Sequence, residues 1–222
     1  MNPQDWREVA SLVAGGTAQT LYMVALATLA TVAAGLPLGV LLCVARKPGA
    51  LDAPRLAAAL GFVVNLGRSV PFVVLLIALI PLTRLIVGTS LGSTAAVVPL
   101  AIGAIPFFAR VVEAALDDID RGRIEAIVSM GGTARHVVQK VLLPEAFPSL
   151  LAGLTLTVVM LIGFSSMAGV VGGGGLGDLA IRYGYQRFNQ RVMIATVIVL
   201  ILLVQAVQML GERLVRSLAH RR

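Results

Sequence analysis

Residues 121–145 decide the fold class of this chain, and they read RGRIEAIVSMGGTARHVVQKVLLPE. This polar stretch lies between far more apolar segments. Aliphatic residues recur at helical spacing on both sides of Gly131-Gly132, and Thr133 can cap the second run. Two short amphipathic helices broken at the glycine pair are therefore predicted, and Pro144 is expected to end the second. A helical hairpin of this kind can press into a groove of a soluble partner.

The flanking segments are typical of a membrane protein. Hydrophobic residues make up 58% of the 222 residues, charged residues make up 13%, and the mean hydropathy is +0.92, which is more apolar than a soluble domain of this length requires. A helix needs about 20 apolar residues to cross about 30 Å of hydrocarbon. The sequence therefore predicts an all-α integral membrane protein with five transmembrane helices, at Val9–Ala45, Leu56–Pro81, Leu85–Ala109, Ala146–Gly177 and Val192–Gly211.

The distribution of lysine and arginine predicts the orientation of the chain. Twelve of these residues lie after the first apolar run, around residues 121–145 and in the C-terminal tail, whereas five lie in the remaining loops. Because basic residues concentrate in cytoplasmic loops, the N-terminus is expected outside the membrane and the C-terminus in the cytoplasm. Residues 121–145 then form a cytoplasmic loop of one transmembrane domain spanning 1–222. This bias also accounts for the net charge of +7, so nucleic-acid binding is not indicated.

The 121–145 stretch resembles the Glu-Ala-Ala loop through which ATP-binding-cassette importer permeases couple to their ATPase. Ile127 replaces the usual third alanine and Val141 the usual isoleucine, but the spacing is kept. The matching residues are Glu125, Ala126, Gly131, Val141, Leu143 and Pro144. Three further segments, residues 67–72, 80–100 and 163–188, resemble permeases of the methionine-uptake branch.

This resemblance implies a type I ABC importer permease that works as a homodimer and carries D- or L-methionine inward. It also implies two partners. A separate ATPase would bind ATP and magnesium and hydrolyse the ATP, and an extracytoplasmic binding protein would deliver the substrate. No cofactor is expected in the permease itself. A permease for another small amino acid or organic solute is the alternative within the same importer class.

A gate is predicted at Met167, which has the small neighbours Ser165 and Ser166. In a dimer, two flexible thioethers could meet and close a pore, and the resemblance implies a gate residue at this place. Packing against lipid or within the bundle is the alternative role.

Three arginines are predicted to dock the binding protein, and they are Arg182, Arg187 and Arg191. They lie on the predicted outer face, where the positive-inside bias makes basic residues rare. Anchoring of this segment at the lipid interface, through its tyrosines, is the competing interpretation.

Arg68 is a charge inside the second predicted span. In a helix that starts at Leu56 it would lie about 18 Å along the axis, near the middle of the bilayer, where an arginine needs a buried partner or a water-filled cavity. If the span instead begins at Arg68, the side chain extends to the interface. Both placements remain open.

Patterns of an enzyme or a secondary transporter are weak in this sequence. His136 and His220 have no carboxylate or cysteine at metal-ligand spacing, and Ser165 and Ser166 have no candidate base. The glycine run at 172–177 is not followed by Gly-Lys-Ser/Thr and is expected to end the fourth helix. A self-contained secondary transporter would need carboxylates in mid-membrane, and the five predicted spans contain no Asp or Glu. No catalytic residue and no metal site are predicted.

Overall fold

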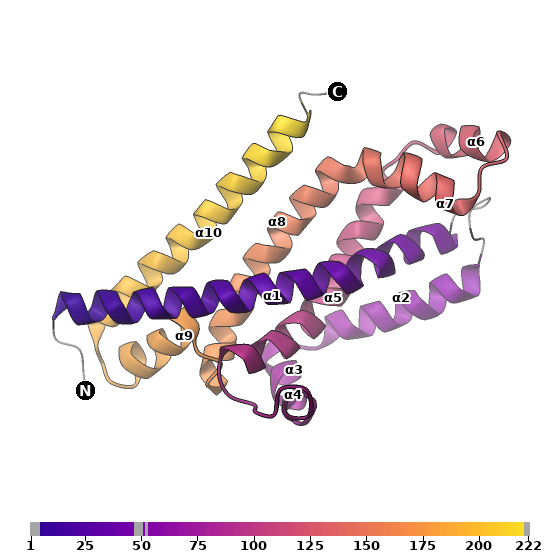
Figure 1. Ribbon diagram of the computed structural model, residues 1–222. Coiled ribbons are helices and arrows are strands. Elements are labelled where there is room, and N and C mark those ends of the chain that lie inside the picture. The colour runs from indigo at the N-terminus through magenta and orange to yellow at the C-terminus, as the bar shows by residue number, and fades with distance from the viewer. Residues whose placement is uncertain (1–4, 47–50, 52, 220–222) are drawn as a thin grey trace. The chain divides into compact units, whose positions relative to one another are not determined.

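The computed structural model describes residues 5–46, 51 and 53–219, and every regular element within these residues is a helix (Figure 1). The longer elements are α1 (Trp6–Arg46), α2 (Pro54–Ser69), α5 (Ser93–Asp117), α8 (Leu143–Ala168) and α10 (Gln190–Ala219). The shorter ones are α3 (Phe72–Ala78), α4 (Ile80–Val87), α6 (Arg121–Ser129), α7 (Ala134–Val137) and α9 (Gly175–Leu179), together with π-helical turns at Val138–Leu142 and Ala180–Tyr185 and a 3₁₀ turn at Gly169–Val171.

The all-α membrane fold is confirmed. Among the described residues, four helical stretches are long and apolar enough to cross a membrane, and they are Trp6–Arg46, Ser93–Asp117, Ala134–Val171 and Gln190–Leu218. The bent pair α2 and α3 gives a fifth span when it is taken as one. The pair is broken because Pro71 lacks an N–H and excludes the preceding residue from helical geometry, which leaves Val70 extended at φ −83° and ψ 124°.

Two predicted boundaries are wrong. The third span does not run over Leu85–Ala109, because Gly88 adopts φ +84° and ends α4, and a new helix begins only at Ser93 and continues to Asp117. Pro144 does not end a helix either. The π-helical turn at Val138–Leu142 widens the backbone just before the proline ring, so α7 continues through it into α8. The expected end of the fourth helix at the glycine run is confirmed, with φ +80° at Gly172.

The described residues form two compact units, each with its own core. The first unit comprises Met1–Ala30, Pro71–Ala104 and Val158–Met209. Its core includes the fully buried side chains of Met23, Leu100 and Leu161, and the rings of Phe72 and Phe164 stack with their centroids 4.1 Å apart. In the same unit, Gln19 and Thr20 of α1 accept the backbone N–H groups of Gly175 and Leu176 at 2.8 and 2.9 Å, and this holds the start of α9 against α1.

The second unit comprises Thr31–Val70, Ile105–Thr157 and Leu210–Arg222. Its core brings together the end of α1, the end of α5, α6, α7 and the start of α8, around the fully buried Val112, Leu116, Val137 and Leu142. Helices α1 and α5 approach closely here. A Cβ added to Gly39 of α1 would lie 2.5 Å from the carbonyl oxygen of Ala109 of α5, so only glycine fits. Small residues allow such contacts where lipid gives helices little apolar drive to associate.

Candidate functional site

Residues 120–142 form the predicted helical hairpin, in which α6 turns back onto α7 (Figure 1). The side chain of Asp120 caps α6 by accepting the N–H of Gly122 at 2.6 Å. The helix ends in a Schellman turn: Gly131 donates its N–H to the carbonyl of Val128 and Gly132 to that of Ile127, both at 2.9 Å. Gly131 adopts φ +78°, a left-handed conformation that favours glycine.

The second helix begins directly after Thr133, which is its N-cap residue, as predicted. The N–H of Thr133 donates to Nδ1 of His136 at 3.2 Å, which satisfies a backbone group at the start of the helix. The two-helix prediction and its break at the glycine pair are therefore confirmed, and His136 serves as a capping residue.

One face of the hairpin is fixed in the core of the second unit. Ile124 is 5% exposed, Val141 is 6% exposed, and Val137 and Leu142 are fully buried. Arg123 of α6 also forms an ion pair with Glu145 of α8, and the hydrogen bond and charge of Glu145 raise the pKa of the guanidinium above its usual value. The hairpin is thus held by both apolar and charged contacts.

The six motif residues divide between the interior and the surface. Val141 is buried and Leu143 is partly buried, whereas Glu125, Ala126, Gly131 and Pro144 are exposed. Sequence reasoning missed Met130, which is 86% exposed at the tip of the hairpin. Its signal was a large apolar residue in a turn, where polar residues are usual. The exposed face carries a carboxylate at Glu125 and a flexible apolar side chain five residues later at Met130.

Met167 lies one residue before the end of α8 and is 45% exposed, whereas its neighbours Ala168 and Gly169 are buried. Ser165 and Ser166 both donate to the carbonyl oxygen of Ile162, at 2.7 and 3.2 Å, so each hydroxyl is satisfied within the helix. A Cβ on Gly169 would collide with the backbone of Gly177 and Asp178. The chain therefore folds back tightly beside an exposed thioether.

The three arginines after α9 contact groups of their own unit. Arg182 pairs with Asp178 at 2.6 Å, and the guanidiniums of Arg182 and Arg187 lie 5.3 and 4.7 Å from the ring centroid of Tyr183. Arg191 lies 5.7 Å over the ring of Trp6. All three remain exposed, so they can meet another molecule, but cation–π contacts already orient them.

Near these arginines, Phe188 is an exposed aromatic residue that the sequence did not single out. It is 87% exposed and adopts φ +55°, which is unusual for a bulky residue. Its neighbour Asn189 is buried and accepts the N–H of Val192 at the start of α10, at 3.3 Å. The side chain of Phe188 is therefore exposed directly before a buried asparagine that caps the start of α10.

Arg68 lies in the last turn of α2 and is exposed, and its guanidinium lies 5.9 Å from the ring centroid of Phe107. The aromatic face supplies a partner that the sequence had not indicated.

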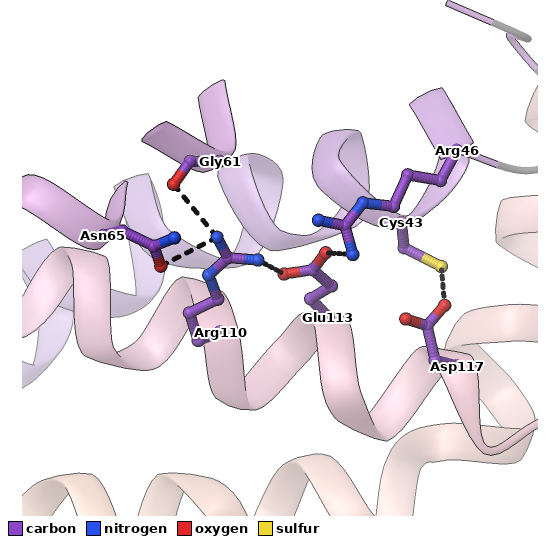
Figure 2. A network of polar contacts seen from close by, with 7 residues as sticks. All are labelled: Cys43, Arg46, Gly61, Asn65, Arg110, Glu113 and Asp117. Carbon is purple, nitrogen blue, oxygen red and sulfur yellow. Dashed lines mark hydrogen bonds and ion pairs between the residues drawn. The ribbon is translucent and has the colours of Figure 1, made fainter. Parts of the chain in front are cut away.

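The structure also brings together charged residues that sequence reasoning missed (Figure 2). Glu113 is only 4% exposed, and its carboxylate lies 2.5 Å from Nη1 of Arg110 and 2.8 Å from Nη1 of Arg46. The statement that the spans contain no acidic residue is therefore wrong for α5, because this span extends to Asp117 and includes Glu113. The sequence signal was the i, i+3 pair of Arg110 and Glu113 within an apolar helical run.

Comparison with known proteins identifies the class of this fold and loop. The model of the family described as binding-protein-dependent transport system inner membrane component matches residues 35–221. The chain is 55% identical over 210 residues to a probable D-methionine transport system permease protein MetI of Vibrio cholerae, covering 95% of this chain and 93% of the relative. It is 48% identical over 221 residues to a probable D-methionine transport system permease protein MetI of Pasteurella multocida, covering both chains completely.

A solved structure agrees with these relatives. A chain of the MetNI methionine ABC transporter in inward-facing conformations superposes with a TM-score of 0.92 at 44% identity, covering 94% of this chain and 97% of that chain. The apolar helices, the helical hairpin and the family match over residues 35–221 lead to one conclusion. This chain belongs to the family of inner-membrane components of binding-protein-dependent transport systems.

Proposed function

We propose that this chain is the permease subunit of an ATP-driven importer that carries methionine across the bacterial inner membrane. The observation that carries the proposal is the hairpin at residues 120–142, ordered and anchored on one face and exposed at Glu125 and Met130 on the other, in a chain 55% identical to a MetI permease. A partner ATPase binds and hydrolyses ATP and presses on this exposed face. The permease itself forms a homodimer and performs no covalent chemistry.

The remaining predicted residues take their roles within this transporter. The whole chain acts as one transmembrane domain, with its N-terminus outside and its C-terminus in the cytoplasm. Met167 closes the path beside Ser165 and Ser166, and its exposed thioether supports this role. The segment of Arg182, Arg187 and Arg191 docks the extracytoplasmic binding protein, supported by the exposure of all three guanidiniums.

The experiment that tests this function is reconstitution with its partners. The tagged permease is co-purified with a methionine-importer ATPase, placed in vesicles with ATP on the side of the hairpin, and given labelled methionine with the binding protein. Uptake that requires both ATP and the ATPase, and that unlabelled methionine inhibits more strongly than other small amino acids, supports the proposal. Methionine uptake without the ATPase, or uptake of a different solute only, contradicts it.

A further inference from the structure

The charged cluster of Arg46, Arg110 and Glu113 connects three helices of the second unit (Figure 2). Arg46 is the last residue of α1, and Arg110 and Glu113 belong to α5. Arg110 also reaches α2, where its Nη2 donates to the carbonyl oxygen of Gly61 at 3.0 Å and to Oδ1 of Asn65 at 2.9 Å. One buried carboxylate and one arginine thus tie the end of α1, α2 and the end of α5 together.

A further contact continues this line along α5. The thiol of Cys43 in α1 donates to Oδ1 of Asp117 at 3.3 Å. Arg110, Glu113 and Asp117 are spaced i, i+3 and i+7, so they share one face of α5. Two polar contacts, Arg46–Glu113 and Cys43–Asp117, thus join α1 to α5 about one helical turn apart.

An adjacent face of α5 packs on the hairpin. Val112 and Leu116 are fully buried in the core that also contains Ile124 of α6 and Val137 of α7. The same helical segment thus contacts α1, α2 and the hairpin. A displacement of the hairpin acts directly on α5.

Separating α5 from α1 at this cluster would be unfavourable in free energy, because it would remove a charged partner from Glu113. A buried carboxylate that loses a partner keeps its desolvation cost without the compensating attraction. Glu113 is 4% exposed beside the half-exposed Arg46, so loss of this ion pair would leave a buried carboxylate with Arg110 as its remaining charged partner. The ion pair therefore adds to the close packing at Gly39 in fixing the register of the two helices.

We propose that Glu113, held between Arg46 and Arg110, is a positioning residue that makes the end of α1, α2 and the end of α5 move as one block with the hairpin during the transport cycle. The consequence for transport rests on the proposed function of an ATP-driven importer. The rigidity of the block is a property of the chain itself and can be measured without transport.

The first test uses the native thiol of Cys43. Asp117→Cys places a second thiol opposite it, and a mild oxidant then joins α1 to α5 in the full-length protein in membranes. We expect rapid disulfide formation, and slower formation when Glu113→Gln or the milder Arg46→Gln is added, because the register is no longer fixed. Glu212→Gln is the matched control, since Glu212 pairs with Arg216 on the exposed face of α10. Unchanged rates with both cluster variants would overturn the proposal.

The second test asks whether the block stays intact during the cycle. We expect the oxidised Asp117→Cys transporter to retain ATP-dependent uptake, because α1 and α5 already move together. Uptake that stops on oxidation and returns on reduction would show that the helices separate, and would overturn the block while leaving the importer function intact. Absence of uptake in the unmodified protein would instead contradict the proposed function, and the disulfide rates would still decide whether the block exists.

Discussion

Gly131 offers a test of the hairpin in which backbone conformation can be separated from side-chain size. Its φ is +78°, and a Cβ added there would meet nothing within 4 Å. A substitution therefore introduces strain without a collision. For most L-residues the left-handed conformation costs about 1–2 kcal/mol, whereas asparagine tolerates it. A cost of this size reduces the population of the ordered turn relative to open forms by about 5–30-fold.

We therefore expect Gly131→Val to weaken assembly with the ATPase strongly, Gly131→Ala to weaken it less, and Gly131→Asn to stay near the original protein. The measurement is the fraction of permease that co-purifies with the ATPase, together with uptake per ATP hydrolysed. Gly15→Ala in α1 is the control, because its Cβ also meets nothing within 4 Å and its backbone is helical. Equal losses for the valine and asparagine variants would refute the conformational argument and assign the effect to bulk at the partner surface.

Four further predictions concern the exposed residues and the orientation. Glu125→Lys reverses an exposed charge on α6 and should reduce co-purification with the ATPase while the permease still reaches the membrane; normal uptake would contradict the coupling role. Met167→Ala removes a 45% exposed side chain, so the protein should fold but leak small solutes or hydrolyse more ATP at rest; an unchanged leak in vesicles would return Met167 to a packing role. Replacing Arg182, Arg187 and Arg191 with Glu should weaken stimulation by the binding protein, with Gln at the same positions as the control. Single exposed ion pairs contribute about 0.2–1 kcal/mol and are screened by salt, so the loss should be partial and largest at low salt. Wild-type stimulation of the Glu variant at low salt would assign the arginines to lipid. With Cys43 replaced, single cysteines at Ser90 and Tyr185 should react with an impermeant thiol reagent applied outside and those at Thr133 and Ser217 should not; the reverse pattern would overturn the orientation.

Local signals made the hairpin predictable. The glycine pair, the capping threonine and the aliphatic spacing all lie within 25 residues, and the Schellman turn and its left-handed glycine follow from them. The break between α2 and α3 could also have been located, because Pro71 restricts the residue before it. Average hydropathy concealed the end of α4 at Gly88, because the stretch GTSLGST at residues 88–94 is uncharged, short and flanked by apolar runs.

The charged cluster could not be predicted from the sequence in the same way. Glu113 forms ion pairs with Arg46 and Arg110, and Arg110 also donates hydrogen bonds to Gly61 and Asn65. Only the i, i+3 pair is local, and the remaining contacts depend on how α1, α2 and α5 pack. The pairing of Arg182 with Asp178 was local, at i, i+4, but its stacking on Tyr183 required the π-helical turn at Ala180–Tyr185.

The division of the loop motif into buried and exposed residues has an evolutionary consequence. Val141 is buried in this chain's own core, so it can vary among aliphatic residues when neighbours such as Val137 and Leu142 change with it, within one gene. Glu125, Ala126 and Met130 face outward. Under the proposed function, a change at any of them requires a compensating change in a second gene, that of the ATPase. Permeases and ATPases exchanged between species should therefore be incompatible at these outward positions first, however different their interiors have become.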